Sequence, residues 1–169
     1  MSLPIPYLIP LGIGLAVATI CDLRWRRIPN AIAGLVFVAG LGVCGYHGGA
    51  SAVLSGLGAS VLMLMVLYAP WKARAIGGGD VKLAIATGAW VGLHHLIWFV
   101  LAAALGGGVV AAVFYLFAPA DTRAEVKANL VLAGLHGEMP AVASHRKGHV
   151  SLPYAVAISV GAAVALLVA

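Results

Sequence analysis

Charged residues are scarce in this chain of 169 residues. Only 9% of the residues are Asp, Glu, Lys or Arg, whereas 63% are hydrophobic and the mean hydropathy is +1.07. An average soluble domain is about 25% charged and roughly 45–50% apolar. The 10 basic and 5 acidic side chains cannot cover a water-soluble globule of this size. The composition therefore excludes a soluble domain and a disordered chain, and it indicates a polytopic helical membrane protein.

Cysteine is nearly absent as well, since the chain holds only Cys21 and Cys44. Two cysteines exclude a disulfide-rich secreted module and a four-cysteine zinc ribbon, and no C-x-x-C pair exists. Cys21 closes the first apolar stretch at one membrane face, whereas Cys44 lies near the opposite face. Roughly 30 Å of hydrocarbon separates these levels, so we expect no disulfide between the two thiols.

Six apolar stretches, separated by polar residues or by Gly and Pro, predict an all-α fold with six transmembrane helices. They cover residues 3–21, 31–46, 50–70, 81–93, 96–118 and 152–169. An alternative interpretation joins residues 81–118 into one span with a re-entrant piece, but His94 and His95 are a poor interior for a single helix. We expect a single domain over residues 1–169, with a cytoplasmic loop at 119–150.

The basic residues orient these spans in the membrane. All 10 Lys and Arg residues fall within or beside alternate connections, at 22–30, 71–80 and 119–151. The connections on the other side, at 47–49 and 94–95, contain histidines but neither Lys nor Arg. Because cytoplasmic connections carry the excess of Lys and Arg, we expect both chain termini to lie outside the cytoplasm.

Two of the five acidic residues lie where a span meets its loop. Asp22 ends the first span and Asp80 opens the fourth, and counting the crossings brings both to the cytoplasmic face. An ionisable group at membrane depth is costly and suggests function. Periodicity does not decide whether the two carboxyls face each other.

The residues beside Asp80 favour chemistry at this face. Gly77, Gly78 and Gly79 precede it and carry no side chains, so that another backbone can approach closely. Two neighbouring carboxyls in a partly desolvated site cannot both ionise easily. One holds a proton as general acid while the other, as general base, activates water. This is the chemistry of aspartic proteolysis, and it requires no metal and no cofactor.

Each carboxyl also has a purely structural interpretation. Asp80 can cap the N-terminus of the helix that follows it, since Gly-Gly-Gly-Asp before an apolar run is a good capping sequence. Asp22 can pair with Arg26 at i+4 if the first helix continues that far. A carboxylate at a helix C-terminus opposes the helix dipole, however, so Asp22 is not explained as a cap.

At these two motifs the sequence resembles the type IV prepilin peptidase family, membrane aspartic proteases with a Gly-x-Gly-Asp signature. Asp22 followed by Ile-Pro-Asn at 28–30 is similar to the family's first aspartate and its Ile-Pro-Asn turn. The run GGGDVKL at 77–83 is similar to the family's Gly-x-Gly-Asp-x-Lys-Leu. Leu-Pro-Tyr-Ala at 152–155 is similar to the Pro-Tyr that opens the family's last span.

The resemblance implies Asp22 and Asp80 as the catalytic pair. It implies supporting or substrate-binding roles for a further set of residues, namely Gly77, Gly78, Gly79, Lys82, Pro29 and Asn30. The implied substrate is a prepilin whose short basic leader is cut on the cytoplasmic side of the bacterial inner membrane, just before its hydrophobic segment. The implied partners are the lipid bilayer and pilus-assembly or secretion machinery, with no nucleic acid.

The chain departs from the family pattern at its N-terminal part, and this narrows the activity that we expect. Longer members carry an N-terminal cytoplasmic insertion with paired C-x-x-C motifs, associated with N-methylation of the new pilin end. Only 21 residues precede Asp22 here, so methyltransferase activity is not expected. The chain resembles the short form associated with tight-adherence (Flp-type) pili. The alternatives are a preflagellin-type or other intramembrane Gly-x-Gly-Asp peptidase, and a small proton-linked transporter that uses the two acids as a relay.

Overall fold

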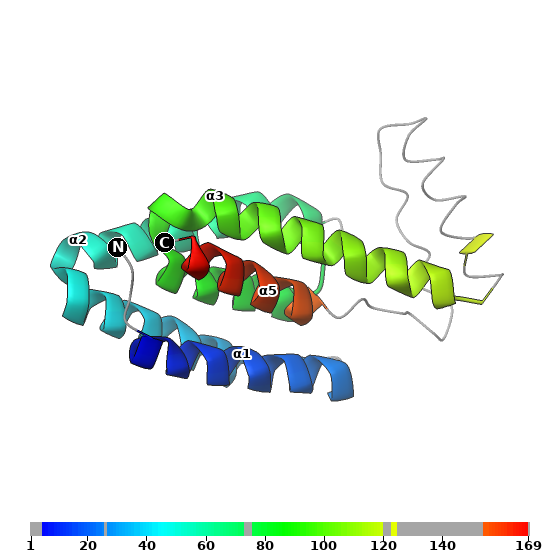
Figure 1. Ribbon diagram of the computed structural model, residues 1–169, viewed down its shortest axis with the longest axis horizontal. Coiled ribbons are helices and arrows are strands. Elements are labelled where there is room, and N and C mark those ends of the chain that lie inside the picture. The colour runs from blue at the N-terminus through cyan, green and yellow to red at the C-terminus, as the bar shows by residue number, and fades with distance from the viewer. Residues whose placement is uncertain (1–4, 26, 73–75, 120–122, 125–153, 169) are drawn as a thin grey trace.

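The computed structural model describes residues 5–25, 27–72, 76–119, 123–124 and 154–168, and all regular structure within these ranges is helical. The helices are α1 (Ile5–Trp25), α2 (Asn30–Lys72), α3 (Gly78–Phe117) and α5 (Tyr154–Leu167), arranged side by side as a bundle (Figure 1). The predicted all-α class is confirmed. Most of the expected loop at 119–150 lies outside the described residues.

The two longest helices are each interrupted at one glycine. Straight helices of 43 and 40 residues would be about 60–65 Å long, twice the thickness of a hydrocarbon core. Gly49 (φ +63°) and Gly92 (φ +67°) instead adopt a left-handed backbone conformation that L side chains rarely take. Figure 1 shows α2 and α3 folding back on themselves, so that each consists of two antiparallel halves.

This continuity corrects the expected count of six separate helices. The described residues form four helices, of which three are long and apolar enough to span a membrane. A single glycine interrupts each long helix, whereas the sequence pattern predicted connections between separate helices at residues 47–49 and 94–95. His94 and His95, expected between two spans, therefore belong to α3. The first helix also continues to Trp25 rather than ending at Cys21.

Small residues allow the helices of the bundle to approach closely. A Cβ atom added to Gly56 of α2 would lie 2.6 Å from the Ala89 carbonyl oxygen of α3. One added to Gly88 would lie 3.3 Å from the backbone of Ser60. The Trp90 indole donates a hydrogen bond to the Val36 carbonyl at 2.7 Å, which ties α3 to the segment of α2 that precedes Gly49. Such contacts between small residues are typical of helices that associate in lipid.

Replacing Gly56 with alanine is expected to destabilise the bundle by about 1–3 kcal/mol, because the added methyl group overlaps a backbone oxygen that cannot move alone. Gly42→Ala is the matched control, since it lies on the same helix with no atom within 4 Å of an added Cβ. That control should gain slightly from the better helix propensity of alanine. Thermal unfolding in detergent measures both variants, and equal midpoints would contradict the close approach.

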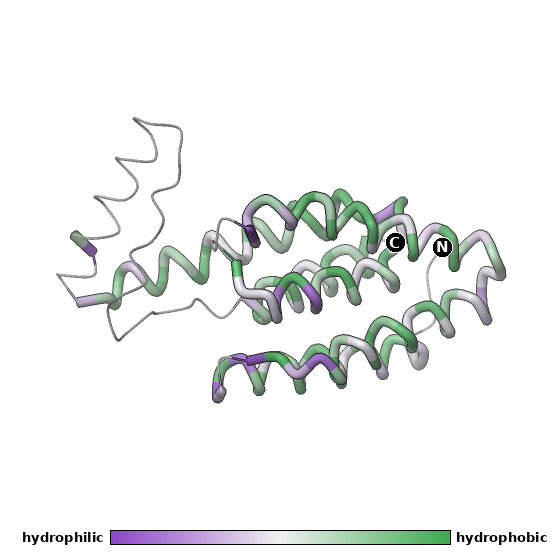
Figure 2. Tube along the Cα trace, turned by 180° about the vertical axis from the view of Figure 1, so that it is seen from behind, coloured by the Kyte–Doolittle hydropathy of each residue, from purple (hydrophilic) through white to green (hydrophobic). Residues whose placement is uncertain are grey.

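The outside of the bundle carries many large apolar side chains. Large side chains such as Ile13, Leu35 and Leu105 are 60%, 71% and 72% exposed. Figure 2 shows hydrophobic residues along most of the length of the helices. An apolar surface of this extent is unfavourable in water and favourable in lipid. Both cysteines are buried and free, as expected.

Candidate active site

Asp22 lies in the last turn of α1, where its side chain is only 9% exposed. A buried carboxylate is costly, and the negative end of the helix dipole adds to this cost. The alternative pairing with Arg26 falls outside the described residues. Burial and the helix dipole both act against an ionised Asp22 at this position.

Asp80 lies in the first turn of α3 and is 8% exposed. The N-cap of α3 is Gly77, and no side chain makes a capping hydrogen bond there. The interpretation of Asp80 as a helix cap is therefore wrong. Its Oδ1 atom is buried and has no hydrogen-bond partner among the described residues. Buried polar atoms are usually paired, so this oxygen is available for a reacting group.

The fold brings the two carboxyls together from different helices. Asp22 arrives on α1, Asp80 starts α3, and the charge of Asp22 acts on Asp80. Sequence periodicity left this convergence open, and the tertiary structure decides it. Tyr154, the first residue of α5, also lies within electrostatic range of Asp80. The sequence indicated its Pro-Tyr motif only as the start of a span, so Tyr154 is a neighbour of the site that the sequence reasoning missed.

The glycine run lets another segment pack directly against the start of α3. A Cβ atom on Gly79 would lie 3.1 Å from the Cβ of Ile28 and 3.4 Å from its backbone nitrogen. A Cβ on Gly77 would lie 2.8 Å from Oδ2 of Asp80 itself. One on Gly78 would lie 3.3 Å from the indole nitrogen of Trp71. The close backbone approach expected from the glycines is present, and the segment that approaches is the Ile-Pro-Asn turn.

Pro29 and Asn30 form the start of α2. The Pro29 carbonyl accepts hydrogen bonds from the amides of Ile32 and Ala33, at 3.1 and 3.4 Å. Asn30 is the first residue of the helix, and its Oδ1 atom accepts a hydrogen bond of 2.8 Å from Nζ of Lys82. The bond joins the two aspartate motifs across 52 residues of sequence. Lys82 thus holds the turn against the first turn of α3.

Loss of the Lys82–Asn30 bond is expected to slow a reaction at the two carboxyls by roughly tenfold or less, because an exposed hydrogen bond contributes little on its own. Lys82→Met and Asn30→Ala should each have this effect, and the double variant should be no slower than either single variant. Lys72→Met, an exposed lysine at the end of α2, is the control. Additive losses in a kinetic double-mutant cycle would show that the two side chains act separately.

None of the described segments brings together three or more His, Cys, Asp or Glu side chains in a way that could hold a metal ion. Lys82 and Asn30 are hydrogen-bonded to each other, and Tyr154 interacts electrostatically with Asp80. We call Asp22 and Asp80 the dyad.

Together these features define a helical membrane protein with a pair of buried carboxyls at one end of the bundle. Residues 9–112, well over half of the chain, match the model of the type IV leader peptidase family. The chain belongs to this family, as its two aspartate motifs predicted, and it is therefore a peptidase. The matched segment includes Asp22, the Ile-Pro-Asn turn, the glycine run and Asp80. We found no match among curated proteins and none among solved structures.

Proposed function

We propose that this protein is an aspartic endopeptidase that removes the short basic leader of a Flp-type prepilin at the cytoplasmic face of the bacterial inner membrane. The observation that carries the proposal is the pairing of Asp22 and Asp80. Both are buried, they come from different helices, and the charge of one acts on the other. Methylation of the new pilin end is not part of the proposal.

In the proposed reaction the two carboxyls share one proton. The ionised carboxylate takes a proton from water as the water oxygen bonds to the scissile carbonyl carbon, and the protonated carboxyl gives its proton to the carbonyl oxygen. The resulting gem-diol collapses when the first carboxyl protonates the leaving nitrogen, the C–N bond breaks, and the second carboxyl takes back a hydroxyl proton. The products are a leader with a C-terminal carboxyl group and a pilin with a free amino group.

The proposal includes a topology of six crossings within one domain over residues 1–169. Each segment of α2 and α3 on either side of Gly49 or Gly92 would cross the membrane once. The segments at 30–48, 50–72 and 93–117 have about the 20 residues that a span requires or more, whereas the segment at 78–91 is shorter. Both termini would then be non-cytoplasmic. Support comes from the basic residues Arg24, Lys72 and Lys82, because the ends of α1 and α2 and the start of α3 that carry them lie at the same end of the bundle (Figure 1).

The experiment that tests this function combines the purified protein with a prepilin from the same genome in lipid vesicles. We expect two products whose masses place the cut just before the hydrophobic segment. Preflagellin serves as the comparison substrate, and its faster cleavage would overturn the assignment to prepilin. Leader removal that survives in both Asp22→Asn and Asp80→Asn would contradict the aspartic mechanism. Proton uptake by the vesicles without any cleavage would instead support the transporter alternative.

A further inference from the structure

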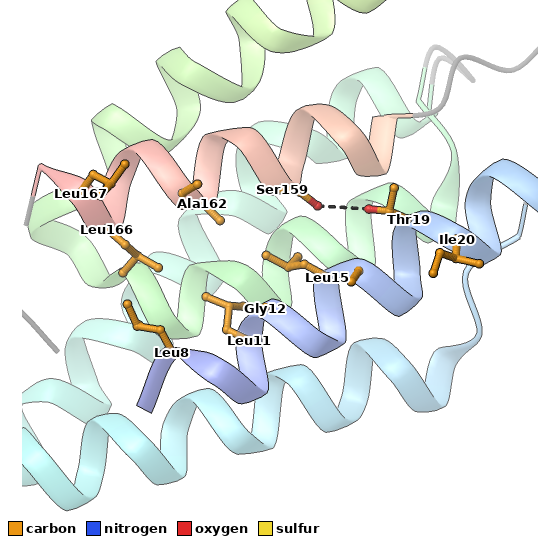
Figure 3. Close-up of a pocket in the computed structure, with 12 residues that line it drawn as sticks. Leu8, Leu11, Gly12, Leu15, Thr19, Ile20, Ser159, Ala162, Leu166 and Leu167 are labelled. Carbon is orange, nitrogen blue, oxygen red and sulfur yellow. Dashed lines mark hydrogen bonds between the residues drawn. The ribbon is translucent and has the colours of Figure 1, made fainter. Parts of the chain in front are cut away.

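An open apolar groove of about 660 Å³ runs between α1 and α5 (Figure 3). We call it the α1–α5 groove. Residues of α1 such as Leu11 and Leu15 line one wall, and residues of α5 such as Ala162 and Leu166 line the other. Figure 3 shows the side chains of the two helices on opposite sides of the space. The groove lies beside the contact between the two helices, in which Leu11, Leu15 and Ala162 are buried.

Both walls carry small residues one helical turn apart. Gly12 and Ala16 have this spacing on α1, and Ser159 and Ala163 have it on α5. Small residues four positions apart let the backbone of another helix approach closely in lipid. A Cβ atom added to Gly12 would meet no atom within 4 Å. Gly12, Ala16 and Ala163 are exposed, so no described helix covers them.

The opposite face of α5 is packed in the usual way. A Cβ atom on Gly161 would lie 2.8 Å from the Cβ of Ala103 and 2.9 Å from the Phe99 carbonyl oxygen, both in α3. Gly161 thus packs closely against α3, whereas Ala163, which lines the groove, is exposed.

The groove leads toward the carboxyl pair. A 3.2 Å hydrogen bond between the hydroxyls of Thr19 and Ser159 joins its two walls at one end (Figure 3). Thr19 precedes Asp22 by three residues, an axial rise of about 4.5 Å. The α1 wall extends from Leu8 to Ile20, which corresponds to roughly 18 Å along the helix axis and more than half of the hydrocarbon thickness.

We propose that the α1–α5 groove holds the apolar transmembrane segment of the prepilin during cleavage, an inference that rests on the proposed function. The scissile bond lies directly before that segment, so the start of the segment has to be level with the dyad while the rest stays in the bilayer. A helix in the groove meets both conditions, because the groove is open and apolar and its lining ends at Ile20, less than one helical turn before Asp22. The substrate helix would run antiparallel to α1 and parallel to α5.

Filling the groove tests this inference. Gly12→Leu adds bulk where nothing lies within 4 Å, and Gly42→Leu adds the same bulk to an exposed, equally open position on α2. Both changes raise helix propensity alike. We expect Gly12→Leu to raise KM for the full prepilin by about tenfold, corresponding to roughly 1.4 kcal/mol of lost binding. Gly42→Leu should leave KM unchanged, and both variants should cleave a leader peptide that lacks the apolar segment at the wild-type rate.

Equal KM values for the two leucine variants would overturn the groove as the binding site and would mean that it holds only lipid. The Asp22→Asn variant, measured in the same assay, separates this outcome from failure of the proposed function, which would appear as cleavage by that variant. Disulfide cross-linking adds a positional test. The enzyme variant carries Ala16→Cys and Asp80→Asn and lacks the native cysteines, and it is paired with pilins that each carry one cysteine at a different position of the apolar segment. Cross-links to cysteines on one face of that segment are expected, whereas cross-links only between two copies of the enzyme would overturn the proposal.

Discussion

Asp22→Asn and Asp80→Asn are each expected to lower the rate of leader removal by about 10³-fold or more, and the double variant is expected to be no slower than the slower single variant. The reason is that in the proposed mechanism the two carboxyls act as one unit, in which neither can serve as acid or base without the other. Residues of this kind show strongly non-additive losses. The measurement is the initial rate of cleavage in vesicles, with product quantified by mass spectrometry.

Stability separates a catalytic loss from a folding defect in these variants. Both side chains are at least nine-tenths buried, and a buried carboxylate is costly whereas its neutral amide is less so. The asparagine variants should therefore unfold at the same temperature as the wild type or slightly higher. Asp121→Asn, in the expected cytoplasmic loop, is the control for removal of an acidic charge. Losses that multiply in the double variant would contradict the paired mechanism.

Replacing Gly79 with valine is expected to reduce cleavage by about 10²-fold, because a displacement of about 1 Å at a reacting group has a cost of this size. The Cβ atom alone would lie 3.1 Å from Ile28, and the two further methyl groups have to displace the Ile-Pro-Asn turn. Gly79 directly precedes Asp80, so the displacement reaches the carboxyl that we propose to be catalytic. The change should appear mainly in kcat rather than in KM.

Gly34→Val is the matched control for this substitution. It lies near the start of α2, is exposed, and has no atom within 4 Å of an added Cβ. Gly79→Ala should fall between wild type and Gly79→Val, since a single methyl group requires Ile28 to move by only a few tenths of an ångström. Wild-type activity in Gly79→Val would show that the contact between the turn and the glycine run does not position the dyad.

Much of the site could be predicted because ionisable residues are so rare in this chain. Only five of the 169 residues are acidic, and two of them, Asp22 and Asp80, lie where an apolar span meets its loop. An ionisable group at membrane depth is costly and suggests function. The glycine run before Asp80 was predicted to admit another backbone, and the segment it admits contains Ile28. These predictions depend on the residue types at neighbouring positions, which can be read directly from the sequence.

The helix count could not be predicted in the same way. The apolar pattern changes little between a helix that ends and one that turns back through a single glycine. The chain has 22 glycines, and only Gly49 and Gly92 adopt positive φ among the described residues. Which glycines bend depends on how α2 and α3 pack, for example on the hydrogen bond from the Leu93 amide to the Ser55 hydroxyl at 2.9 Å.

The sequence by itself determined that this is a helical membrane protein, its family and the identity of its two buried acids, because composition and short motifs are sufficient for each. Only the tertiary structure decided that Lys82 binds Asn30, that Tyr154 lies near Asp80, and that α1 and α5 leave a groove between them. These features join residues from helices far apart in sequence. They are set by side-chain volume and backbone approach across helix interfaces, which no local pattern encodes.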